Sequence, residues 1–138
     1  MRWLPEALLS MILLAGCSAN SVEDQAKQLG VREFTVQAWT TGTQEERGQM
    51  IASFLAKYRV TDLTGKQVRG LLGPSTGYYD YDEYPAYLVG PKTVKSDYGN
   101  GYLWVFVTDK SSGEVRKVIL VPAVESKRAS RLVRPIVS

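Results

Sequence analysis

The sequence of 138 residues contains no histidine and only one cysteine. Without histidine, the chain lacks the most common general base and the most common metal ligand of proteins. A single cysteine cannot form an internal disulfide. A Gly-x-Ser-x-Gly motif is also absent, so nothing in the sequence supports a serine or cysteine nucleophile. We therefore expect a protein that is not an enzyme and that holds neither a metal nor a cofactor.

Long apolar runs are missing as well, because the apolar segment from Ala7 to Ala15 is far shorter than the roughly 20 residues that a membrane-spanning helix needs. Arg2 precedes this segment, and Leu14-Ala15-Gly16-Cys17 ends it. These features resemble the signal peptide and lipobox of bacterial lipoproteins, in which the chain is cut before a lipidated cysteine. The alternative is an ordinary secretory signal peptide. We predict that residues 1–16 are removed and that Cys17 is acylated.

The lipoprotein resemblance implies three acyl chains on Cys17, and such an anchor in the lipid bilayer is effectively permanent. Ser18 follows the cysteine, where an aspartate would favour retention at the inner membrane. By analogy with sorting in double-membraned bacteria, we expect the protein at the outer membrane, facing the periplasm. The net charge of +3 is mild and indicates no nucleic-acid partner.

The mature chain is long enough for one domain. Residues 17–42 are expected to hold the lipidated cysteine, a polar tether as far as Gly30, and a short strand or packing arm from Val31 to Trp39. Residues 43–124 are expected to form the domain, and residues 125–138 form a basic tail. The tail contains Lys127, Arg128, Arg131 and Arg134. It either binds anionic lipid or lipopolysaccharide phosphates or serves as a solubilising end.

Two capping boxes predict where helices begin. Thr43 is followed three residues later by Glu46, and Thr64 by Gln67. An apolar stripe at helical spacing follows the first box, and a shorter stripe follows the second. The residues of the two stripes are Met50, Ile51, Phe54, Leu55 and Tyr58, then Val68, Leu71 and Leu72. Gly73 and Pro74 stop the second helix.

Strand patterns fill the last third of the domain, over residues 86–89, 101–108 and 114–121. Residues 109–113 form a hairpin loop with a glycine at its end. We predict an α+β fold in which a two-helix layer packs on a three-stranded antiparallel β-meander. Trp104 and Phe106 should share one side of the middle strand. Since the other side is also apolar, this strand is either central or part of a contact surface.

A helix, a Gly-x-x-Val turn into a second helix, a Leu-Gly-Pro stop and strands succeed one another along residues 47–121. The pattern is carried by Arg47, Met50, Leu55, Leu63, Gly65, Val68, Leu71, Leu72, Gly73, Pro74, Tyr87, Val89 and Gly90. In these residues the chain is similar to the SmpA/OmlA (BamE) group of small outer-membrane lipoproteins and, more broadly, to domains with the beta-lactamase-inhibitory-protein-like fold. The resemblance implies a two-layer α+β domain that works by contact with proteins, as an accessory of outer-membrane protein assembly.

The run from Tyr78 to Tyr84 consists of four tyrosines and three acids. Tyrosine brings a large contact area at a small entropy cost, so the run is a candidate contact surface. The candidate contact residues in this run are Tyr78, Tyr79, Tyr81, Asp82 and Tyr84. Trp104 of the middle strand is a further candidate, because the strand is apolar on both sides. Alternatively, the rings and carboxylates bind a sugar, a peptide or a calcium ion, or the run is simply a solvated loop. A glycosidase pair among its acids is disfavoured, because nothing nearby would raise the pKa of one of them.

These expectations describe a non-enzymatic envelope lipoprotein that acts as a protein-protein interaction module. The alternative is an envelope lipoprotein that binds a small ligand, glycan or peptide through the tyrosine-rich acidic loop. An exposed apolar patch on the sheet would favour the first function, whereas a concave pocket at the loop would favour the second.

Overall fold

A computed structural model of the chain describes residues 21–125, and the predicted signal peptide, Cys17 and the basic tail lie outside these residues. The described part has an α+β fold, as the sequence predicted. Its helices are α1 (Val22–Leu29), α2 (Val36–Thr41), α3 (Gln44–Gln49), α4 (Ile51–Lys57), the 3-10 helix η1 (Val60–Asp62) and α5 (Gly65–Leu72). Its strands are β1 (Ala86–Val89), β2 (Lys95–Ser96), β3 (Gly99–Asn100), β4 (Tyr102–Thr108) and β5 (Val115–Val121).

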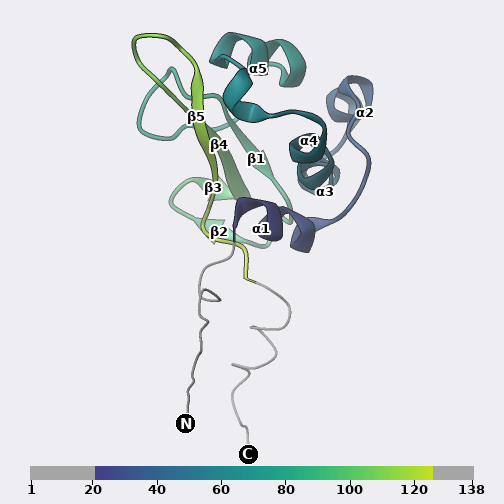
Figure 1. Ribbon diagram of the computed structural model, residues 1–138. Coiled ribbons are helices and arrows are strands. Elements are labelled where there is room, and N and C mark those ends of the chain that lie inside the picture. Colours follow the sequence, from purple (N-terminus) through teal and green to yellow (C-terminus); the bar gives the residue numbers. More distant parts are fainter. Residues whose placement is uncertain (1–20, 126–138) are drawn as a thin grey trace, which may run out of the picture.

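The main sheet is an antiparallel meander in the order β1-β4-β5, and β2 and β3 form a small hairpin between β1 and β4. Trp104 on the central strand lies opposite Tyr87 on β1 and Leu120 on β5. The register shifts between Val107 and Thr108, where β4 nears the hairpin loop. In Figure 1 the helices lie together on one side of the sheet. The three predicted strands are therefore confirmed, each within one residue of its expected start.

Both predicted capping boxes are present, at Thr43 with Glu46 and at Thr64 with Gln67. The expected single helix from residue 44 is divided into α3 and α4 at Met50, whose φ of −95° and ψ of −6° deviate from helical values. Gly48 on α3 packs so closely on β1 that a Cβ there would lie 2.8 Å from the Gly90 nitrogen. This close approach explains a glycine that weakens the helix.

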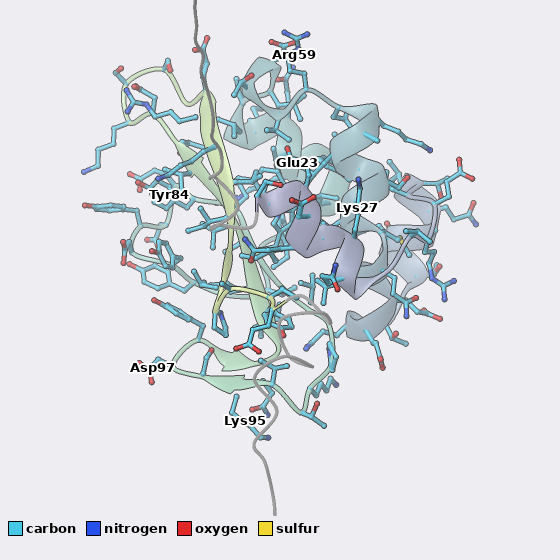
Figure 2. All side chains as sticks on the ribbon, turned by 60° about the horizontal axis from the view of Figure 1, so that its bottom comes forward. Glu23, Lys27, Arg59, Tyr84, Lys95 and Asp97 are labelled. Carbon is cyan, nitrogen blue, oxygen red and sulfur yellow. The ribbon has the colours of Figure 1, made fainter. Side chains whose placement is uncertain are left out.

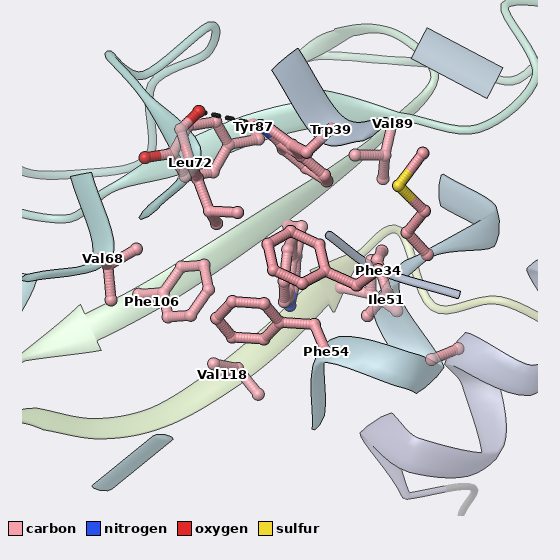
Figure 3. Close-up of a cluster of buried hydrophobic side chains, with 14 of the residues drawn as sticks. Phe34, Trp39, Ile51, Phe54, Val68, Leu72, Tyr87, Val89, Phe106 and Val118 are labelled. Atoms are coloured by element: carbon pink, nitrogen blue, oxygen red, sulfur yellow. Dashed lines mark hydrogen bonds between the residues drawn. The ribbon is translucent and has the colours of Figure 1, made fainter. Parts of the chain in front are cut away.

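Aromatic rings form the core between the helices and the sheet (Figure 3). Phe54 on α4 contacts Trp104 edge-on, with ring centroids 5.3 Å apart, and Trp39 on α2 contacts Tyr87 in the same way at 5.7 Å. Trp104 and Phe106 share the helix-facing side of β4, as predicted. A mainly aromatic core suits this small domain, because each buried ring removes a large apolar area from water.

The chain before residue 43 differs from the expected polar tether and from the expected strand, whereas the alternative of a packing arm agrees with the structure. Residues 22–29 form a helix instead, because Ser21 caps its start and Val22, Ala26 and Leu29 share one helical face. The segment expected as a strand contains helix α2, which Thr35 caps. Phe34 and Trp39 are almost completely buried in the core. The packed domain thus begins about twenty residues earlier than the sequence suggested.

The two ends of the described chain lie side by side, since the Val124 amide donates a hydrogen bond of 2.8 Å to the Gln25 side chain on α1. In Figure 1 the coloured chain begins and ends at one end of the domain, and the β4–β5 hairpin lies at the opposite end. Among residues 21–125, no helix has the length and apolar character needed to cross a membrane.

Candidate functional site

The sheet face that points away from the helices carries a second apolar cluster. Ala86, Leu103 and Val105 are fully buried there. Further residues of this cluster are partly exposed: Tyr79, Tyr84, Leu88, Val107, Ile119 and Val121. Residues 74–85, which lead from α5 to β1, cover the buried side chains of this cluster. The expectation that β4 is apolar on both sides because it is central is confirmed.

Hydrogen bonds fasten this segment along the outer edge of β1. The Thr76 and Gly77 amides both donate to the Ala86 carbonyl, at 2.9 and 3.1 Å. The Ser75 hydroxyl accepts from the Ala86 amide at 3.1 Å, and the Thr76 hydroxyl accepts from the Leu88 amide at 2.9 Å. Gly77 lies against the sheet so closely that a Cβ would overlap the Leu103 side chain. The segment is therefore held in one position above the sheet.

Five tyrosines gather on this side of the molecule, and we call Tyr78, Tyr79, Tyr81, Tyr84 and Tyr98 the tyrosine face. Two ring pairs organise it, with centroids 5.5 Å apart for Tyr79 and Tyr98 and 5.2 Å apart for Tyr81 and Tyr84. Tyr78, Tyr81 and Tyr98 remain 57%, 43% and 39% exposed. Figure 2 shows Tyr84 and neighbouring rings on the side of the sheet opposite the helices.

The loop that carries four of these tyrosines contains a tight turn at Asp80. Asp80 has a φ of 60°, which non-glycine residues rarely adopt. The Tyr78 hydroxyl donates to the Asp80 carbonyl at 2.6 Å, and Arg69 on α5 donates to the Asp82 carbonyl at 2.8 Å. The side chains of Asp80, Asp82 and Glu83 are exposed, and none forms an ion pair within residues 21–125. The backbone of the loop is thus fixed while its carboxylates face water.

The β4–β5 hairpin borders the tyrosine face. The Lys110 ammonium lies 4.4 Å from the centre of the Tyr81 ring, in a cation–π contact. Asp109 accepts hydrogen bonds from the Ser111 hydroxyl and amide and from the Ser112 amide, and it pairs with Arg116 at 3.1 Å. These hydrogen bonds, with the charge of Arg116, hold the pKa of Asp109 well below its usual value.

A concavity of about 400 Å³ opens between the tyrosine face and this hairpin. Its walls are formed by Tyr81, Tyr84, Val107, Thr108, Asp109, Lys110, Ser111 and Arg116. Stacking rings and charged groups of both signs therefore line the same hollow.

The structure brings together five of the six contact residues that the sequence suggested, and Trp104 is the exception. Its side chain is fully buried on the helix-facing side of β4, in contact with Phe54, so it cannot reach a partner on the outer face. Tyr98 also belongs to the tyrosine face, although it was not among the predicted contact residues. This residue belongs to the β2–β3 turn, and no local pattern indicates that it pairs with Tyr79.

The site combines exposed aromatic rings with charged side chains of both signs. Within residues 21–125, no cluster of three or more histidine, cysteine, aspartate or glutamate side chains could hold a metal ion. Comparison with family models, curated proteins and solved structures found no match for the chain. Its function must therefore be inferred from its own residues.

Proposed function

We propose that this protein is a bacterial envelope lipoprotein, anchored through acylated Cys17, whose domain binds another envelope protein through the tyrosine face. The observation that carries the proposal is the exposure of Tyr78 and Tyr81, at 57% and 43%, on a loop with a fixed backbone. Rigid, exposed tyrosines are typical of protein interfaces, because each ring adds apolar contact area while its hydroxyl forms hydrogen bonds.

The breadth of the surface supports a protein partner. Partly exposed apolar side chains of β1, β4 and β5 continue the surface beyond the tyrosines, including Leu88, Ile119 and Val121. A stable protein interface buries about 800 Å² on each partner, which a broad face can offer and a single small pocket cannot. We infer that the partner covers both the loop and the neighbouring strands.

The hollow beside Tyr81 favours a second candidate function, the binding of a small ligand, glycan or peptide. Its volume of about 400 Å³ suits a molecule of one or two rings. Tyr81 and Tyr84 can stack on a sugar ring, and Lys110 and Arg116 can bind carboxylates or hydroxyls. In this alternative the outer strands make no contact with the ligand.

The cellular setting is proposed from the sequence. The lipobox places the anchor at Cys17, four residues before Ser21, and Ser18 favours the outer membrane. The resemblance to the SmpA/OmlA (BamE) group adds an accessory role in outer-membrane protein assembly. Because the described chain starts and ends opposite the β4–β5 hairpin, this arrangement would present the hairpin end away from the membrane (Figure 1).

Crosslinking in native cells, followed by purification of the tagged protein and identification of its partner, tests the proposal. The Tyr81→Ser, Tyr98→Ser double variant should lose the partner and keep its melting temperature, because both side chains are exposed and neither hydroxyl holds the loop backbone. A Val31→Ser, Val36→Ser variant is the matched control, since it removes two exposed apolar side chains elsewhere. Unchanged capture by the tyrosine variant would reject the tyrosine face as the binding surface.

The anchor needs its own test. A Cys17→Ser variant should leave the membrane fraction after washing at high salt, whereas the native protein should remain. Retention of the variant would reject the lipid anchor without affecting the proposal for the tyrosine face.

A further inference from the structure

A second pocket, of about 380 Å³, lies where α5 begins beside the β4–β5 hairpin. It is lined by Thr64, Gly65, Lys66, Arg69, Glu83, Thr108, Asp109, Lys110, Ser112 and Gly113. The Gly65 amide donates to the Gly113 carbonyl at 2.9 Å, which joins the helix to the hairpin. In Figure 1 this end of the domain is the one farthest from the two ends of the coloured chain. The pocket adjoins the tyrosine face but none of the five tyrosines lines it.

The pocket has an excess of positive charge. Lys66, Arg69 and Lys110 line it, and none of them forms an ion pair within the described residues. Two acids oppose them, but Asp109 is already paired with Arg116, which lies outside this pocket. Glu83 is then the one acid of the lining without a cationic partner among the described residues, whereas the lining contains three cations. Such a lining attracts an anion.

The first turn of α5 leaves one backbone donor for that anion. The Thr64 amide donates to the Gln67 side chain, the Gln67 amide to the Thr64 hydroxyl, and the Gly65 amide to Gly113. The Lys66 amide has no such partner among residues 21–125. A free amide in the first turn of a helix points out of the helix end. It can therefore donate to an anion there, where the positive end of the helix dipole also favours negative charge.

Thr108 supplies an independent indication of a ligand. It is only 5% exposed, it lines the pocket, and its hydroxyl forms no hydrogen bond within the described part of the chain. The hydroxyl is not among the buried unpaired polar atoms of residues 21–125, so it keeps contact with solvent at the pocket wall, where it can donate to a bound molecule. Thr108 is the last residue of β4 and directly follows the shift in register between Val107 and Thr108.

We propose that this pocket binds a phosphate group. Lys66, Arg69 and Lys110 neutralise its charge, and the Lys66 amide and the Thr108 hydroxyl donate to its oxygens. Mixed lysine and arginine side chains with a helix N-terminus are well suited to phosphate oxygens. The proposal goes beyond the tyrosine face, and it can fail or succeed independently of a protein partner.

The test is a titration of the isotope-labelled full chain, in a neutral detergent, with inorganic phosphate at constant ionic strength. We expect saturable shifts of the Lys66, Thr108 and Gly113 amide signals, and no such shifts with chloride. The Lys66→Gln, Lys110→Gln variant should bind about tenfold more weakly, as the loss of charge-assisted hydrogen bonds requires. The matched control, Lys92→Gln with Lys95→Gln, changes two exposed lysines of the β2–β3 region and should bind as tightly as the native chain.

Two further measurements test the Thr108 hydroxyl and the size of the bound molecule. Thr108→Val preserves shape, so it should weaken phosphate binding several-fold without lowering the melting temperature. Glucose 1-phosphate tests whether the phosphate belongs to a larger molecule. Tighter binding of this ester, lost in Tyr81→Ser, identifies a sugar phosphate that reaches the tyrosine face, whereas equal binding identifies phosphate alone. Absence of saturable shifts with both probes, or identical shifts in the lysine variant, would overturn the proposal.

Discussion

The indole N–H of Trp39 donates a buried hydrogen bond of 2.8 Å to the Leu72 carbonyl, which joins α2 to the end of α5 (Figure 3). The other core tryptophan, Trp104, has an indole N–H with no hydrogen-bond partner in the described chain. Two buried tryptophans therefore differ in whether their polar atom is satisfied.

This difference predicts unequal effects of the same substitution. Trp39→Phe leaves the Leu72 carbonyl unpaired, whereas Trp104→Phe removes a donor that is already unpaired. Both variants lose similar volume, so Trp39→Phe should lower the free energy of unfolding by about 1–3 kcal/mol more than Trp104→Phe. Urea unfolding followed by circular dichroism measures this difference. Equal losses would contradict the role given to the Trp39 hydrogen bond.

Tyr87 predicts a loss of stability at alkaline pH. Its hydroxyl donates to the Gly73 carbonyl at 2.7 Å, and burial raises the pKa of Tyr87 to about 12. The unfolded chain ionises this tyrosine near its usual pKa of about 10. The contribution to stability is thus complete below pH 10 and is lost as the pH rises toward 12.

The measurement is the free energy of unfolding between pH 9 and 12. Tyr87→Phe should be less stable than the native chain at pH 9, because it lacks the hydrogen bond to Gly73. Its stability should then fall less steeply with rising pH. A parallel decline of both proteins would show that Tyr87 ionises equally in the folded and unfolded states.

Asp109 predicts the opposite dependence on pH. Because hydrogen bonds from Ser111 and Ser112 hold its pKa below the usual value, its contribution is present above the unfolded pKa of about 3.9. It is lost as the pH falls below that value toward the pKa of the folded state. Asp109→Asn should therefore show a smaller loss of stability between pH 5 and 2 than the native chain. Glu114→Gln is a suitable control, since this exposed acid lies just beyond the same loop.

Two glycines should respond to alanine in opposite ways. A Cβ at Gly77 would overlap the Leu103 side chain. Gly77→Ala should therefore lower the melting temperature and displace the segment of residues 74–85 from the sheet. At Gly70 on α5, the corresponding position has no atom within 4 Å apart from the chain neighbours and the backbone of the same helix. Gly70→Ala should therefore stabilise the protein by up to about 1 kcal/mol through helix propensity. A neutral Gly77→Ala would show that the loop is not held against Leu103.

The sequence predicted those helices and strands that have a clear local signal, either a capping box or an apolar run. The capping boxes at Thr43 and Thr64 and the apolar strands gave the positions of α3, α5, β1, β4 and β5. The helices α1 and α2 have caps at Ser21 and Thr35, but both are so short that these local signals are weak, and long-range contacts stabilise them. Trp39 on α2, for example, contacts Tyr87 on β1 with ring centroids 5.7 Å apart, a relation that the spacing of residues along the chain does not reveal.

The candidate site was predictable to the extent that it is local. Tyr78, Tyr79, Tyr81, Asp82 and Tyr84 are neighbours in the sequence and remain together in the fold. Tyr98 joins them only because the β2–β3 hairpin places its ring beside Tyr79. The alternation of side chains along β4 correctly assigned its residues to two sides of the strand. It does not indicate which of the two sides the helices cover. For that reason Trp104 was included in the contact surface and is found in the core.

The most direct test of the proposed function is photo-crosslinking in native cells with a photoreactive amino acid at position 81, compared with the same amino acid at position 31. Both native side chains are exposed, Tyr81 at 43% and Val31 at 82%, so both probes reach solvent. We predict that position 81 yields a covalent adduct with one envelope protein and that position 31 does not. Adducts at position 31 alone, or the same adducts at both positions, would contradict binding through the tyrosine face.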